Sequence, residues 1–182
     1  MAVVSFAAAF RSLADEVPTR PAVVCDGVST SRGELEQAAR RRASDWASRG
    51  IGTGDTIAIA LPNGVAFFEC VLAAWKLGAV PMPLSHRLPE REQREIVSLA
   101  GPALIIGAPV DRYPDVPCIP DATLPEKEGD PADLPDRTSP HAHAIASGGS
   151  SGRPKVIVDG QPGRFDSSAA HYGMGPDARV LI

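Results

Sequence analysis

The sequence predicts an α/β fold built on a largely parallel β-sheet with flanking helices. Short apolar runs alternate, over much of the chain, with stretches in which apolar side chains recur every three or four residues. One run, residues 55–61, is almost wholly apolar and stops at Pro62, Asn63 and Gly64, as is typical of a strand covered on both faces. A chain of 182 residues is long enough for one medium domain with a sizeable core.

The chain begins with a predicted amphipathic helix. Its large apolar side chains recur at helical spacing: Phe6, Phe10, Leu13 and Val17. No positive charge precedes this apolar start, and Arg11 and Asp15 follow at once, so the pattern does not favour a signal peptide.

A β-hairpin and a second helix are predicted next. Residues 21–26 and 28–31 are strand-like runs, and Asp26 with Gly27 between them tolerates the positive φ of a tight turn. A helix over residues 31–50 is indicated by a capping box and by a glycine at the C-cap position. These signals are Ser31, Glu34 and Gly50.

A β-α-β unit follows, and then one more helix and strand. The apolar strand is followed by a helix whose buried stripe extends from Val65 to Trp75 and which ends at Gly78, and then by a strand over residues 79–84. Pro89 suits a first helical position, so we expect a helix to start there and to precede a strand at residues 103–107.

The rest of the chain is richer in proline. Residues 109–140 contain eight prolines and eight acidic side chains and have little apolar pattern, so we expect a surface connection without a buried element. Residues 142–147 and 155–159 are predicted strands, and a short helix is expected near residues 165–172. The fold would thus divide into an N-terminal α/β portion, residues 1–140, and a second segment, residues 141–182.

The last five residues, 178–182, resemble a strand that has only begun. We therefore expect the chain to be the N-terminal piece of a longer protein. Because an unpaired strand edge recruits partners, we also expect the chain to form a homo-oligomer.

Composition and charge argue against several classes of protein. Eighteen basic and 22 acidic side chains give a net charge of -4, without the broad basic field that would gather a nucleic acid. The three cysteines, Cys25, Cys70 and Cys118, are widely spaced and contain no CxxC pair, so neither a disulfide framework nor a zinc site is indicated. The sequence contains no run of about 18 or more apolar residues, the length that a transmembrane helix needs. A cytoplasmic protein without a nucleic-acid partner fits these observations best.

The chemistry of the chain is concentrated in residues 147–155, which read Ser-Gly-Gly-Ser-Ser-Gly-Arg-Pro-Lys. Glycines let successive backbone N–H groups point into one concavity, hydroxyls add donors, and a lysine supplies a compact positive charge, so phosphate is the natural ligand. The candidate phosphate-binding residues are Ser147, Gly148, Gly149, Ser150, Ser151, Gly152 and Lys155.

Other loops fit this segment less well. The GxxxxGK[ST] pattern of nucleoside triphosphatases fails because Arg153 and Pro154 separate Gly152 from the lysine. A GxSxG hydrolase motif with Ser150 as nucleophile is present, but β-rich sequence follows where a nucleophile elbow needs a helix. A solvated Gly-Ser linker is the plain alternative, and the flanking strands disfavour it.

At these residues the sequence resembles the adenylate-forming enzymes, which include acyl-CoA synthetases, luciferases and peptide-synthetase adenylation domains. Their phosphate loop reads [T/S]-S-G-[S/T]-T-G-x-P-K, and this chain departs from it in having Gly148 for serine and Ser151 for threonine. The Ser-Gly-Gly form resembles a variant of bile-acid and related CoA ligases. The resemblance continues at residues 54–63, similar to the family's GD-x-V-A-x-x-x-x-N segment, and at residues 77–84, similar to its L-G-A-V-x-x-P-L turn.

The resemblance implies that the chain is the first part of the family's large domain. A full enzyme of this kind would join a carboxylic acid to the α-phosphate of Mg-ATP, release pyrophosphate and pass the acyl group to coenzyme A, with ATP, Mg2+ and CoA as co-substrates. The family's adenine, ribose, magnesium and catalytic-lysine segments are not recognisable here. No catalytic residue and no metal ligand is therefore assigned to this chain, and we expect it to be inactive alone. A non-catalytic nucleotide-binding or interaction fragment is the alternative.

Four features have plainer interpretations beside the functional ones. Lys155 could be a surface lysine whose stem packs on the sheet. His141 and His143 share one strand face, but without a third ligand they are expected to be structural or exposed rather than metal-binding. We expect Cys70 to pack in the core and the Arg40–Arg42 cluster to lie on a solvated helix face.

Overall fold

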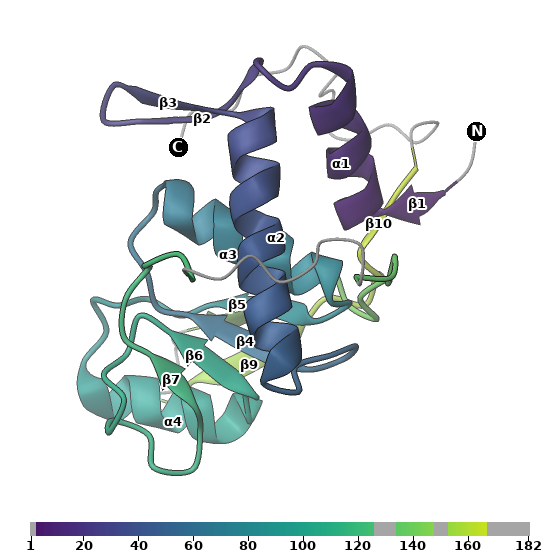
Figure 1. Ribbon diagram of the computed structural model, residues 1–182. Helices are drawn as coiled ribbons and strands as arrows, with labels where there is room; N and C mark the ends of the chain where they lie inside the picture. The colour runs from purple at the N-terminus through teal and green to yellow at the C-terminus, as the bar shows by residue number, and fades with distance from the viewer. Residues whose placement is uncertain (1–2, 126–133, 148–152, 167–182) are drawn as a thin grey trace.

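The fold is centred on a four-stranded parallel sheet in the computed structural model, which describes residues 3–125, 134–147 and 153–166 (Figure 1). The strand order is β5-β4-β6-β7, and all three pairings are parallel. The strands are β4 (Thr56–Ile59), β5 (Val80–Pro83), β6 (Leu104–Ile106) and β7 (Cys118–Ile119). The predicted α/β fold with a largely parallel sheet is confirmed.

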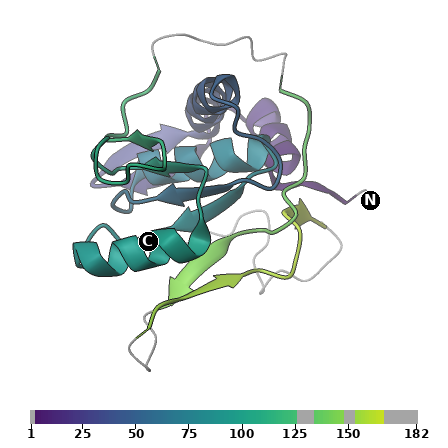
Figure 2. The ribbon, with the colours of Figure 1, turned by 90° about the horizontal axis from the view of Figure 1, so that it is seen from below.

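Helices cover both faces of this sheet. Figure 2 shows a layer made of helices on one side of the sheet and a layer made of helix and strand on the other. The first layer consists of α1 (Phe6–Glu16), α2 (Arg32–Ser48) and α3 (Val65–Lys76). The second layer consists of α4 (Glu90–Ala100), β8 (Ala144–Ser147) and β9 (Lys155–Val158).

The central strand, β4, therefore contributes to two cores. Ile57 and Ile59 pack with Trp46 and the α2–α3 side, whereas Ala58 packs with Met82 and the α4 side. Because both faces are buried, the strand needs no polar alternation, which explains its continuous apolar sequence.

The N-terminal elements follow their local signals. The Ser31 hydroxyl accepts from the Glu34 N–H, and the Glu34 carboxylate accepts from the Ser31 N–H at 2.8 Å, so the capping box is complete. These bonds to Ser31 lower the pKa of the Glu34 carboxyl. The predicted hairpin consists of β2 (Pro21–Cys25) and β3 (Val28–Ser31), and both turn residues, Asp26 and Gly27, have positive φ.

The predicted apolar stripe of the first helix is wrong in part. Leu13 and Val17 are exposed, and the residues of α1 that are fully buried are Ala7 and Ala14. The small side chains let α1 lie close to α2 and α3, while Phe6 contacts the Trp75 ring with centroids 4.8 Å apart. Close helix approach selects alanine at the contact, which a search for large apolar residues misses.

The proline-rich segment 109–140 is more than a surface connection. It contains β7, which hydrogen-bonds to β6 through Ile105 N–H to Pro117 O at 3.0 Å and Gly107 N–H to Ile119 O at 2.7 Å. The segment also buries Tyr113. A two-residue strand between prolines has no periodicity to detect, and it forms because the edge of β6 offers unpaired backbone groups.

Arg42 corrects the prediction of a solvated arginine cluster. Its guanidinium is buried and lies 2.6 Å from the Glu69 carboxylate, and it also donates to Ala122 O. A smaller correction concerns Pro89, which is the N-cap residue of α4 rather than its first helical residue.

The end of the chain agrees only partly with expectation. Phe165 was expected to open a helix but lies in β10 (Arg164–Phe165), which pairs with β1 (Val4–Ser5). Residue 166 is not helical either, and residues 167–172 of that predicted helix and the strand at 178–182 lie outside the described residues. Within the parts of the chain that are described, no helix has both the length and the apolar character that crossing a membrane requires.

Candidate phosphate-binding site

The candidate site is the loop between β8 and β9, two strands that form an antiparallel pair. Their register places Ser147 directly opposite Lys155, so the first and last predicted site residues face each other at the mouth of the loop. The other five, Gly148, Gly149, Ser150, Ser151 and Gly152, lie outside the described residues. The predicted strands on both sides of the loop are confirmed, and they form a separate two-stranded sheet.

The two faces of this hairpin differ. Ala144, Ala146 and Val156 pack into the core formed with α4 and β5. Since successive side chains of a strand point to opposite faces, Ser147 and Lys155 project from the other face. Lys155 is exposed, as a residue that binds a charged ligand from solvent must be.

Hydrogen bonds fix the base of the hairpin to the rest of the protein. The Trp75 indole N–H, from α3, donates to Ala142 O at 2.8 Å, just before β8 begins. Across the hairpin, His141 Nδ1 lies 2.7 Å from Asp159 O, a contact in which the ring nitrogen donates because a carbonyl can only accept. The loop is therefore carried by a hairpin whose base is tied to α3, a role for Trp75 that its helical spacing alone does not reveal.

His141 and His143, the two candidate metal ligands of the sequence, contact Asp159 rather than a set of metal-binding side chains among the described residues. His143 Nδ1 lies 3.4 Å from the Asp159 carboxylate, while the His141 ring bonds to the backbone. Among the described residues there is no group of three or more His, Cys, Asp or Glu side chains that could hold a metal ion. We therefore assign no magnesium ligand to these residues.

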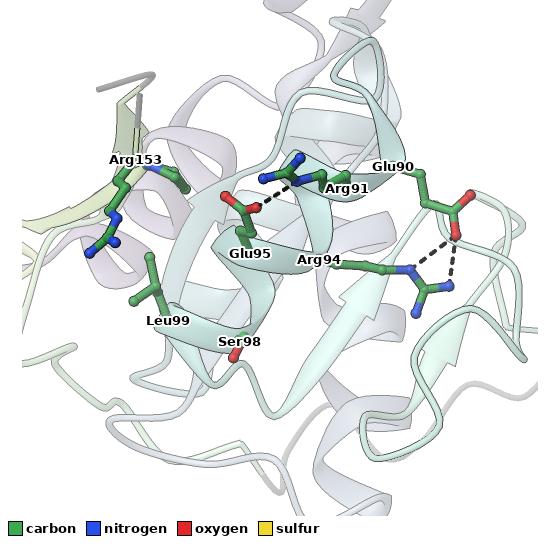
Figure 3. A pocket seen from close by; sticks show the side chains of 8 residues that line it. Glu90, Arg91, Arg94, Glu95, Ser98, Leu99 and Arg153 are labelled. Carbon is green, nitrogen blue, oxygen red and sulfur yellow. Dashed lines mark hydrogen bonds and ion pairs between the residues drawn. The ribbon is translucent and has the colours of Figure 1, made fainter. Parts of the chain in front are cut away.

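A groove borders the loop on its C-terminal side. It has a volume of about 900 Å³ and lies between α4 and residues 153–154, immediately before Lys155. Figure 3 shows Arg153 and Leu99 on one side and two ion pairs of α4 along the other. These pairs are Arg91 with Glu95 at 3.0 Å and Arg94 with Glu90 at 2.7 Å. Sequence reasoning missed this groove, because it depends on how α4 lies against the hairpin.

Cys70 takes no part in this site. Burial raises the pKa of its thiol to about 12, so almost no thiolate exists near neutral pH. Its predicted packing role in the core is confirmed.

This architecture and its sequence are shared with a known family. The sequence model of the family described as AMP-binding enzyme matches residues 10–172. The chain belongs to the AMP-binding enzyme family. The predicted membership in the adenylate-forming superfamily is thereby confirmed.

Curated relatives of this AMP-binding chain are much longer than it is. Novobiocin biosynthesis protein H of Streptomyces niveus is 32% identical over 187 residues, covering 90% of this chain and 30% of the relative. Isonitrile lipopeptide synthase of Streptomyces coeruleorubidus is 31% identical over 171 residues, covering 88% of this chain and 12% of the relative. The chain thus spans less than a third of either protein.

Solved structures of the superfamily share the fold. The N-terminal subdomain of Klebsiella oxytoca NpsA, in complex with 3-hydroxybenzoyl-AMSN, superposes with a TM-score of 0.71 at 21% identity, over 85% of this chain and 40% of that one. O-succinylbenzoate coenzyme A synthetase of Bacillus subtilis, in complex with AMP, gives a TM-score of 0.70 at 21% identity, over 86% of this chain and 42% of that one. The α/β fold of this AMP-binding chain therefore corresponds to the N-terminal part of the adenylate-forming large domain.

Proposed function

We propose that this chain supplies the phosphate-binding loop of an enzyme that activates a carboxylic acid with ATP. In that reaction a carboxylate oxygen attacks the α-phosphorus, the bond to the bridging oxygen of pyrophosphate breaks, and an acyl-adenylate forms. The observation that carries the proposal is the pairing of Ser147 with Lys155 at the two ends of a Gly-Ser loop, in a member of the AMP-binding family.

The proposed role of the loop follows from the chemistry of its residues. Negative charge accumulates on pyrophosphate as it leaves, and fixed N–H donors, hydroxyls and an ammonium group stabilise it there. Lys155 is the charged member, and Ser150 and Ser151 are the proposed hydroxyl donors to the β- and γ-phosphates. The magnesium ion that accompanies ATP would add positive charge there when it is bound.

For the second half-reaction we propose a thiol acceptor that attacks the acyl carbon and displaces AMP. Coenzyme A is the acceptor that the sequence resemblance implies, and one structural neighbour is a coenzyme A synthetase. A thiol on a carrier domain is the second candidate, because another neighbour, NpsA-ThdA of Klebsiella oxytoca, is an artificially fused adenylation–PCP didomain. Comparing AMP release with coenzyme A and with a carrier protein as acceptor distinguishes the two.

The first half of the proposal can be tested on this chain by titrating it with ATP and with pyrophosphate. Lys155→Ala should weaken binding of both by roughly 10- to 150-fold, because a hydrogen bond to a charged group contributes about 1.5–3 kcal/mol. Isothermal titration calorimetry gives the two affinities directly.

Arg91→Ala is the matched control for this measurement. It also removes one positive charge near the loop, from a side chain of the neighbouring groove that is 90% exposed. Equal losses in both variants would indicate general charge attraction. An unchanged affinity in Lys155→Ala would support a surface lysine instead.

A further inference from the structure

A small cavity lies among α1, α2, α3 and residues 134–136, in the segment that leads towards β8. Its volume is about 30 Å³, which is the share of one water molecule in the liquid. The segment is tied to the start of α1, because the Ser5 hydroxyl donates to the Asp136 carboxylate at 2.6 Å. The charged residues that line the cavity are Arg11, Glu36, Arg40, Lys76 and Asp136.

One carboxylate oxygen of Glu36 needs a hydrogen-bond donor. Oε1 accepts from the Lys76 ammonium at 2.5 Å, and each of the two side chains is only 8% exposed. Oε2 is buried and has no hydrogen-bond partner among the described residues. A buried acceptor without a donor destabilises the fold, and an ordered water often supplies the missing bond. The cavity beside Glu36 has room for such a donor.

The arginines of the cavity cannot complete this bond by themselves. Neither the Arg11 nor the Arg40 guanidinium bonds to Glu36 Oε2 directly. Both lie close enough to act on Lys76: burial is the largest cause of its lowered pKa, and these two positive charges lower the pKa further. A guanidinium donates and cannot accept, whereas an ionised carboxylate accepts and cannot donate. A molecule that joins the two groups must therefore do both.

We propose that this cavity binds one ordered water molecule, which donates to Glu36 Oε2 and accepts from the guanidinium of Arg11 or Arg40. Chloride is attracted by the positive charges, but it has no proton to donate to the carboxylate. A metal cation would lie beside three positively charged side chains and would be repelled by them. The water extends the Lys76–Glu36 ion pair into a network that satisfies both carboxylate oxygens.

A high-resolution crystal structure of this chain, with crystals soaked in bromide, identifies the occupant. We expect a density peak within hydrogen-bond distance of Glu36 Oε2 and no anomalous scattering from it. Anomalous scattering at this place would identify a halide and overturn the proposal. A dry cavity, or an arginine bonded directly to Oε2, would overturn it as well.

Ala8 also lines the cavity and allows a matched pair of substitutions. Ala8→Thr and Ala8→Val add side chains of the same shape and similar helix propensity, and both should displace the water. Only threonine brings a hydroxyl that can donate to Glu36 Oε2 in its place. The folding equilibrium constant of Ala8→Val, measured by urea denaturation, should therefore be roughly 5- to 150-fold below that of Ala8→Thr. Equal constants would contradict the proposal.

The double variant Glu36→Leu with Lys76→Met provides the control background, because it removes the ion pair and the carboxylate oxygen together. Apolar residues of similar volume can replace a buried ion pair without loss of stability. In this background the advantage of Ala8→Thr over Ala8→Val should vanish or reverse, since no carboxylate remains for the hydroxyl. An advantage that persists would come from packing or helix propensity alone, and the proposal would then be wrong.

Discussion

Two features require glycine at position 107: a positive φ, and the lack of room for a Cβ atom next to the backbone of Ala60. It follows β6 with a φ of 88°, and a Cβ added there would lie 2.7 Å from the carbonyl oxygen of Ala60. Its N–H bonds to Ile119 O, so the same residue lets the chain pass close to β4 and pairs it with β7. Any side chain at this position must push backbone against backbone.

We expect Gly107→Ala to destabilise the protein far more than Gly50→Ala does. Gly50 has a φ of 87°, but a Cβ there would meet no atom within 4 Å, so the two variants share the conformational strain and differ in the clash. The shared strain costs about 1–2 kcal/mol. The clash should raise the loss in Gly107→Ala to about 3 kcal/mol or more. Urea unfolding measures both, and equal losses would show that β6 can move away from β4.

At the scale of elements, α2 and α3 are joined by two buried ion pairs. Arg42 pairs with Glu69 at 2.6 Å, and Lys76 pairs with Glu36 at 2.5 Å (the helices cross in Figure 1). Burial lowers the pKa of Lys76 even though Glu36 raises it, so desolvation outweighs the pairing there. These pairs contribute less net stability than their short distances suggest, and they specify how the two helices align.

Glu69→Ala should lower the free energy of unfolding by about 3–5 kcal/mol, because it leaves the buried Arg42 guanidinium without its counter-ion. Replacing both partners, Arg42→Met with Glu69→Leu, should recover most of this loss. Asp45→Ala is the control: it breaks a pair with Arg49, whose side chain is 53% exposed, and should cost under about 1 kcal/mol. Chemical denaturation checks all three, and a double variant as unstable as the single one would contradict the argument.

Elements with local signals could be predicted from the sequence, and elements that depend on distant partners could not. The capping box at Ser31 and the turn at Asp26 act within a few residues, so the pattern is sufficient. Strand β7 forms because β6 offers it an edge, and Arg42 is buried because Glu69 lies beside it. Neither partner is near in sequence.

The candidate site divides in the same way. The loop composition at residues 147–155 indicates phosphate binding without any tertiary information. The opposition of Ser147 and Lys155 follows from the strand register, and the groove beside Arg153 follows from the position of α4. Which hairpin face is packed and which is open could be known only from the fold.

For the whole molecule, the parallel sheet joins two hydrophobic cores that lie on its opposite faces. Strand β4 is bonded to β5 on one side and to β6 on the other, and its residues 57–59 are fully buried. The β2–β3 hairpin, in contrast, is a two-stranded sheet at the edge of the structure, with Val24 and Val28 both 65% exposed. Local stability should therefore decrease from β4 towards this hairpin.

Native-state hydrogen exchange should reveal that gradient. The amides of β4 and β6 can exchange only when the sheet and both cores open together, so they should report the global free energy of unfolding. The amides of β2 and β3 should exchange on the order of 100-fold faster or more, because a two-stranded hairpin is marginally stable by itself and can open while the sheet stays intact. Rates corrected for intrinsic exchange, measured by mass spectrometry or NMR, make the comparison. Equal protection in β2 and β4 would mean that the hairpin and the sheet unfold as one cooperative unit.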